Sequence, residues 1–92
     1  MYLEIVTPEA TLLAAEVDSI AVPGINGEFQ MLNSHAPIVS LLGEGDVKIY
    51  GKVELAKDVA NKFTKGDKGE IVLSINSGTI EMKDNKVIVL AD

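Results

Sequence analysis

The sequence predicts an all-β fold, either a sandwich or a barrel, from three observations. Short apolar runs follow one another along most of the chain. Within several runs, such as Glu28–Leu32 and Val47–Tyr50, apolar and polar residues alternate, which is typical of strands with one buried face. Turn-forming residues separate the runs, and closely spaced strands and turns indicate a β-sandwich or barrel.

The first half of the chain holds these strand-like runs: Leu3–Ile5, Leu12–Val17, Ser19–Val22, Glu28–Leu32 and Ile38–Leu42. The turn pairs between them are Thr7-Pro8, Pro23-Gly24 and Asn26-Gly27. Pro fixes φ, and Asn and Gly tolerate positive φ, so the chain is expected to reverse at these pairs. In the fourth run we expect Phe29 and Met31 to face the core while Glu28 and Gln30 face water.

The second half repeats the pattern after a break at Gly43–Asp46. The expected strands are Val47–Leu55, Ile71–Ile75, Thr79–Met82 and Lys86–Leu90. Asn76–Gly78 and Asp84-Asn85 are expected to be turns, and Lys65–Gly69 a solvated loop.

One segment departs from the strand pattern. Ala56, Val59, Ala60 and Phe63 have the i, i+3, i+4, i+7 spacing of an amphipathic helix. Gly66 is a suitable residue to end such a helix. We therefore predict one short helix over about residues 56–65, with a strand hairpin as the competing interpretation.

The composition fits a single domain over residues 1–92. The chain has 92 residues, of which 47% are hydrophobic, and this is enough for one packed core. It has no cysteine, which excludes disulfides and thiolate metal sites. The formal net charge is −6 and no basic stripe stands out, so nucleic acid is not an expected partner.

The N-terminus and the apolar runs bear on location. No run reaches the length of about 18 residues that a membrane span needs. Met1–Val6 lacks the basic start and the long apolar block of a signal peptide. We therefore expect a cytoplasmic protein, or one that is peripheral to a membrane through a partner.

Ser34 and His35 are the pair that suggests catalysis. A nucleophile needs its base within about 3 Å, whereas adjacent side chains of an extended segment point to opposite faces. His35 is the only histidine, so no other base can replace it. We expect no Ser/His chemistry, and instead expect His35 to brace the bend before Pro37, which restricts Ala36 to extended conformations.

Metal and phosphate sites are not expected either. One histidine without cysteine cannot make a usual zinc shell, and the Glu44/Asp46 pair lacks the ligand spacing of a calcium loop. Pro23–Gly27 is glycine-rich, but no lysine and no helix follow it. We predict no metal and no cofactor, so a binding or structural role in an exposed turn on a rigid scaffold becomes the main expectation.

Four segments in order resemble the N-terminal domain of the ε subunit of rotary F-type ATP synthases. They are Ile5–Glu9, Glu16–Gly24, Gly27–Phe29 and His35–Ile38, and the chain end, Asn85–Asp92, also resembles the end of that domain. The resemblance implies a ten-stranded β-sandwich. It also implies a non-catalytic rotor subunit of the central stalk, which couples proton-driven rotation of the c-ring to ATP synthesis on other subunits.

The same resemblance implies the partners and the contact residues. The γ subunit and the c-ring are the direct partners, and the catalytic α and β subunits are indirect ones. The implied contact residues are Gly27, Glu28, Phe29, His35, Ala36 and Pro37. Glu28 would meet the c-ring loops, His35 would lie near both γ and the c-ring, and both turns would lie at one rotor-facing end. The implied location is the cytoplasmic face of the bacterial inner membrane, held there by the complex.

The chain departs from the family in three places. Many members continue into two C-terminal helices, whereas this chain stops at Asp92. A natural short form and a truncated one both remain open, and no ATP binding or inhibition by those helices is carried over. The segment Tyr50–Gly69 is longer than the family's usual hairpin, and Ser77-Gly78 stands where the family has Gly-Gly.

Two other classes of function remain as alternatives. A ligand-binding sandwich, for instance for sugars, needs a concave patch with exposed aromatic side chains, but aromatic residues make up only 4% of the chain. A small hydrolase would need further groups that converge on His35.

Overall fold

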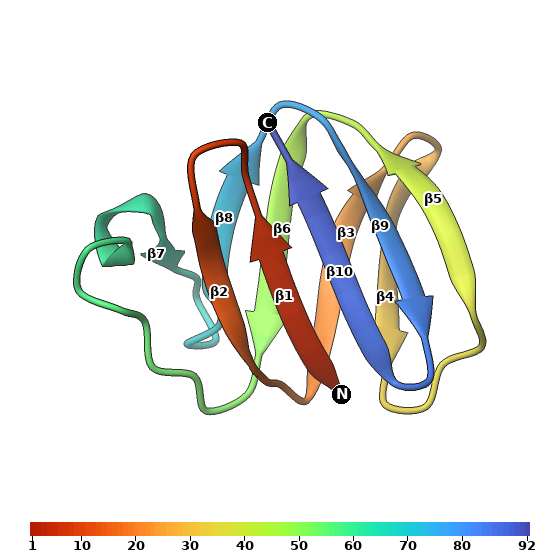
Figure 1. The fold of residues 1–92 in the computed structure, drawn as a ribbon, viewed down its shortest axis with the longest axis horizontal. Helices are drawn as coiled ribbons and strands as arrows, with labels where there is room; N and C mark the ends of the chain where they lie inside the picture. The colour runs from red at the N-terminus through yellow and green to blue at the C-terminus, as the bar shows by residue number, and fades with distance from the viewer.

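The computed structural model describes all of residues 1–92 and confirms the all-β prediction with ten strands (Figure 1). The strands are β1 Tyr2–Val6, β2 Thr11–Glu16, β3 Ser19–Gly24, β4 Gly27–Leu32, β5 Ile38–Leu42, β6 Gly45–Tyr50, β7 Thr64–Lys65, β8 Ile71–Ile75, β9 Gly78–Lys83 and β10 Lys86–Ala91. One 3₁₀-helix, η1 Ala60–Lys62, precedes β7.

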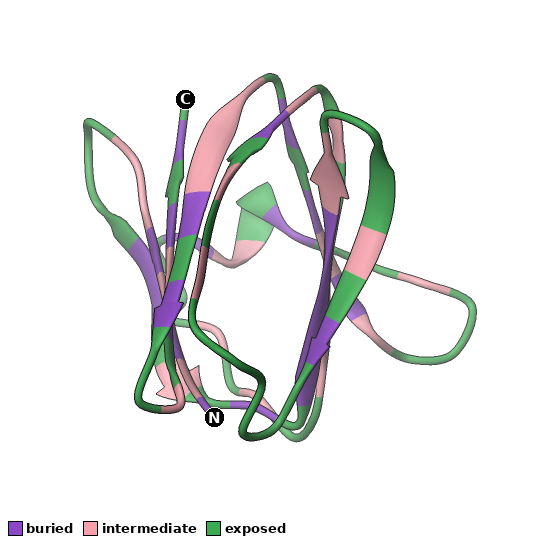
Figure 2. Cartoon of the chain, turned by 90° about the vertical axis from the view of Figure 1, so that its right-hand side faces the viewer, coloured by how far each residue is buried: buried purple, intermediate pink, exposed green.

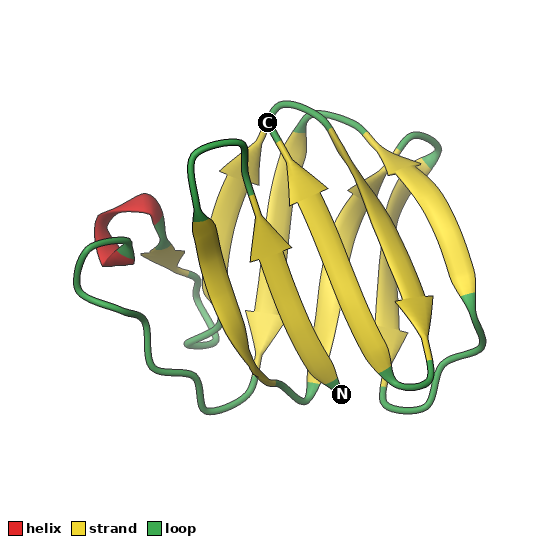
Figure 3. Cartoon of the chain, viewed as in Figure 1, coloured by secondary structure: helices red, strands yellow, loops and turns green.

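The strands form the two facing layers of a sandwich (Figure 3). The front layer in Figure 1 has the strand order β2-β1-β10-β9-β5, and the back layer has the order β4-β3-β6-β8-β7. A single pair, Gly24 of β3 with Leu42 of β5, joins the two layers at one side. The predicted β-sandwich is therefore confirmed, with nine strands linked into one continuous hydrogen-bonded path and β4 paired to β3 beside it.

The first and last strands lie side by side in the front layer. β1 and β10 are parallel, in a register that runs from Tyr2 beside Lys86 to Val6 beside Leu90. Every other strand pair is antiparallel. The N-terminus lies at the lower end of the sandwich in Figure 1 and the C-terminus at the upper end.

The core fills the space between the layers, because the strands alternate between buried and outward residues (Figure 2). The fully buried large side chains are Leu3, Ile5, Ile20, Val22, Met31, Val47, Ile49, Ile80, Met82, Val87 and Val89. Burial of each such side chain contributes roughly 1.5–3 kcal/mol relative to exposure. In β4, Met31 is buried and Glu28 and Gln30 are exposed, as the alternation predicts, and Phe29 is half-buried.

The prediction for residues 47–65 is wrong in two respects. β6 ends at Tyr50 instead of Leu55, and Gly51 follows with a φ of 135° that favours glycine. Over residues 56–65 the structure has η1 and β7 in place of an α-helix. No side chain caps Val59 at the start of η1, and a helix of about ten residues is marginal in water without strong tertiary contacts.

Residues 51–70 form a lobe at the edge of the sandwich beyond β2 and β8, which we call the edge lobe (Figure 1). Val59 and Phe63 are buried in it, and Val53 and Leu55 pack against them and the main core. The apolar spacing that predicts a helix is thus satisfied by packing of a mostly irregular segment.

Position 78, at the start of β9, requires glycine. A Cβ at this position would collide with the backbone carbonyl oxygen of Leu90 on the neighbouring strand β10. The Ser77-Gly78 sequence therefore keeps glycine at the position where the neighbouring backbone leaves no room for a side chain.

Candidate partner-docking side

The predicted contact residues lie at opposite ends of one strand. Gly27, Glu28 and Phe29 begin β4 next to the β3–β4 turn, whereas His35–Pro37 belong to the loop that follows β4. Since β4 runs the height of the sandwich between them (Figure 1), the expectation that both turns share one end is wrong. The number of residues between the turns is the length of an extended strand, and an extended strand separates its ends instead of bringing them together.

β5 nevertheless places both turns on the same side of the molecule. It starts after the His35 loop and ends where Leu42 pairs with Gly24, at the level of the β3–β4 turn. The side chains of Val39 and Leu41 on β5 are 74% and 59% exposed. We call this the β4–β5 side; it faces the viewer in Figure 2.

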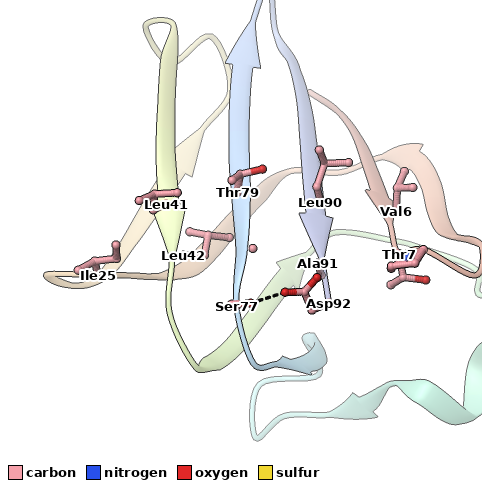
Figure 4. Close-up of a pocket in the computed structure, with 12 residues that line it drawn as sticks. Val6, Thr7, Ile25, Leu41, Leu42, Ser77, Thr79, Leu90, Ala91 and Asp92 are labelled. Atoms are coloured by element: carbon pink, nitrogen blue, oxygen red, sulfur yellow. Dashed lines mark hydrogen bonds between the residues drawn. The ribbon is translucent and has the colours of Figure 1, made fainter.

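An apolar row continues from β5 across the outer face of the front layer. Strand register places Leu41 beside Thr79, Thr79 beside Leu90 and Leu90 beside Val6. Together with Ile25 of the β3–β4 turn and the Ser77–Asp92 contact, these residues line a shallow hollow of about 620 Å³ (Figure 4). The hollow is wide and apolar, which fits a protein surface better than a small polar ligand.

Four of the five exposed large hydrophobic side chains lie in this region. They are Ile25 in the β3–β4 turn, Val39 and Leu41 on β5, and Leu90 in the apolar row. The fifth, Leu32, lies at the far end of β4. Contiguous exposed apolar surface marks interaction sites in folded proteins, so the β4–β5 side with the apolar row is the candidate docking site.

Glu28 forms an ion pair within the chain. Its Oε1 lies 3.0 Å from Nζ of Lys48 on β6, and both side chains are partly exposed. The hydrogen bond from Lys48 to Glu28, followed by the negative charge of Glu28, raises the pKa of Lys48 above its usual 10.5. The carboxylate is therefore held in place at the edge of the β4–β5 side while it remains accessible.

His35 is exposed, and its ring is directed to the backbone. Its Nδ1 lies 2.7 Å from the carbonyl oxygen of Ala36, and its backbone N–H donates to the carbonyl oxygen of Leu32 at 3.1 Å. These contacts agree with the expectation that His35 braces the bend before Pro37.

The 3₁₀-helix of three residues is far too short to traverse a lipid bilayer.

Reasoning from the sequence missed Ile25, Val39, Leu41 and Leu90. The run Ile38–Leu42 has apolar residues at both odd and even positions, so both faces of this strand are apolar. Only one face can point to the core, and the apolar residues of the other face are exposed unless something covers them. That signal was available, but strand order was needed to add Leu90 of β10 to the same surface.

These features define a β-sandwich domain with one exposed apolar side. The chain belongs to the family of the ATP synthase delta/epsilon chain, β-sandwich domain, which matches residues 1–92. It is 38% identical over 90 residues to an ATP synthase epsilon chain of Leptospira interrogans, a match that covers 98% of this chain and 59% of the relative. It is 36% identical over 92 residues to the epsilon chain of Campylobacter concisus, covering 100% of this chain and 60% of the relative.

A solved structure has the same fold. A chain from the central stalk/c-ring structure of the Tetrahymena thermophila mitochondrial ATP synthase superposes with a TM-score of 0.73 at 19% identity. The match covers 99% of this chain and 62% of that chain. The chain thus spans about three-fifths of the length of these relatives.

Proposed function

We propose that this protein is a central-stalk subunit of a rotary ATP synthase that ties the γ subunit to the c-ring and catalyses no reaction itself. The observation that carries the proposal is the gathering of four of the five exposed large hydrophobic side chains on the β4–β5 side and its apolar row. The family match and the relatives named ATP synthase epsilon chain support it.

The two partners take different parts of the surface. The γ subunit covers the apolar part, from the His35 loop (His35, Ala36 and Pro37) along Val39 and Leu41 to Leu90, because burial of this surface favours a protein partner. The c-ring meets the β3–β4 turn with Gly27, Glu28 and Phe29, because the Glu28 carboxylate suits polar loops. The separation of the two turns by the length of β4 allows both partners to bind at once.

The rigidity of the sandwich suits a coupling role. A closely packed core transmits strain with little deformation, so rotation of the c-ring would reach γ through this domain. The ATP chemistry takes place on the α and β subunits, which this subunit reaches only through γ. The complex holds the protein at the cytoplasmic face of the bacterial inner membrane.

Calorimetric titration of the chain with the γ subunit of the same source tests the proposal. We expect one-to-one binding, and we expect Val39→Lys to weaken it at least tenfold, because a charge would enter an apolar contact. Ala14→Lys, at an exposed position of β2 on the opposite edge of the front layer, is the matched control and should stay within about twofold. Absence of binding between folded partners, or equal effects of the two variants, would refute this docking surface.

A further inference from the structure

The loop that carries His35 is held by a residue far away in the sequence. The side chain of Asn85, in the β9–β10 turn, contacts the loop with both of its polar atoms. Its Oδ1 accepts the backbone N–H of Ser34 at 2.8 Å, and its Nδ2 donates to Oδ1 of Asn33 at 2.9 Å. Asn33 Oδ1 also accepts the amine of Met1 at 2.9 Å, which fixes the orientation of the Asn33 amide.

The contact fixes an uncommon backbone conformation. Ser34 has a φ of 63°, a left-handed conformation that residues other than glycine rarely adopt. Ser34 immediately precedes His35, so its conformation sets the direction in which His35 leaves β4. The hydrogen bond from the Ser34 N–H to Asn85 stabilises this conformation. Without the bond, we expect the loop to populate this conformation only in part.

The β9–β10 turn does not itself need the side chain of Asn85. Asp84 and Asn85 have φ values of 52° and 61° and connect Lys83 to Lys86, which is the two-residue type I′ hairpin geometry. Glycine is preferred at the second position of such a turn, and Asp-Gly is among its most favourable pairs. The amide of Asn85 thus forms its hydrogen bonds with the neighbouring loop and is not needed by the hairpin.

We propose that Asn85 is a positioning residue, whose side-chain amide holds the His35 loop in the conformation that the γ subunit binds. This inference rests on the proposed function, because it assigns a determinant to the same docking side. It adds a residue that acts on the docking side through its hydrogen bonds with Ser34 and Asn33.

Asn85→Gly distinguishes the effect on the His35 loop from the effect on the β9–β10 turn. It improves the hairpin and removes the clamp, so the domain should remain folded. We expect the amide of Ser34 to exchange faster with solvent and the affinity for γ to fall about tenfold, as for a binding-competent loop population reduced to about a tenth. Asp84→Gly is the matched control, since it changes the same turn and keeps both Asn85 contacts, and its affinity should stay within about twofold.

A double-mutant cycle distinguishes positioning from a general effect on the domain. If Asn85 acts through the loop, Asn85→Gly should weaken γ binding much less in a His35→Ala background than in the natural chain. Full additivity, or natural affinity in Asn85→Gly, would overturn this inference while γ binding by the natural chain still supported the proposed function. Failure of the natural chain to bind γ would overturn both, whereas faster Ser34 exchange in Asn85→Gly would still report the clamp.

Discussion

Glu28, a proposed contact residue, is held in position by an ion pair within its own chain. The pair with Lys48 holds the carboxylate beside the β3–β4 turn, although the Glu28 side chain remains 53% exposed. Exposed ion pairs contribute little to stability, so we infer that the main effect of this pair is to position the Glu28 carboxylate.

Glu28→Lys should weaken docking on the c-ring and leave the fold intact, because it reverses the charge at the proposed contact and places two lysines together. Lys48→Gln is the control, since it also breaks the ion pair but leaves the Glu28 carboxylate available. Binding to purified c-ring, with thermal unfolding of each variant, measures both effects. Equal loss of binding in the two variants would show that the pair, and not the Glu28 charge, is what matters.

The same pair makes a prediction about alkaline pH. The pKa of Lys48 is raised in the folded protein, so its charged form is favoured by folding. The contribution of the pair is fully present below 10.5, the usual pKa, and is lost as the pH rises through the higher folded-state value. Natural chain and Lys48→Gln should therefore differ by the same small amount at neutral pH and at pH about 9, and converge only at more alkaline pH.

Among the elements, the strands could be predicted because their information is local. Alternation marks β4 and the Val47–Tyr50 part of β6, and turn pairs such as Asn26-Gly27 and Asp84-Asn85 mark the reversals. The edge lobe could not be predicted, because the same apolar spacing serves either a helix or an irregular segment packed on a core. That the two proposed contact turns lie on one side of the molecule also depends on strand order, which no local pattern contains.

The edge lobe should unfold by itself when its anchor is removed. Phe63 is only 7% exposed and lies in the edge lobe, between η1 and β7. Phe63→Ala should therefore speed amide exchange over residues 59–65 and cost about 1–2 kcal/mol in global unfolding, since local opening limits the loss. Leu73→Ala, in the main core on β8, is the contrasting variant and should cost about 2–5 kcal/mol. Amide exchange by mass spectrometry and chemical denaturation test this, and a uniform rise in exchange in Phe63→Ala would contradict it.

At the scale of the whole molecule, the pairing of β1 with both β2 and β10 makes the N-terminal strand essential to the front layer. Ile5 has no exposed surface, and its neighbour Glu4 points outward to an ion pair with Lys86 at 3.3 Å. Substitutions at these two positions therefore compare the stability contributions of the buried face and the outward face of β1.

Ile5→Asp should unfold the entire domain, because an unpaired buried carboxylate costs several kcal/mol and a small domain has about 5–15 kcal/mol of stability in total. Glu4→Ala should lower the free energy of unfolding by no more than about 1 kcal/mol. Circular dichroism with urea titration reads out both variants. A folded Ile5→Asp domain at neutral pH would show that β1 is dispensable.

The parallel arrangement of β1 and β10 also determines how the domain responds to force. The chain ends emerge at opposite ends of two adjacent strands, whose register covers five residue pairs from Tyr2 with Lys86 to Val6 with Leu90. A pull that separates the ends slides one strand along the other, so it loads the hydrogen bonds between them together, in shear. A hairpin pulled from its open end would instead release its bonds one after another. The sandwich is therefore built to be stiff along the line that joins its two ends.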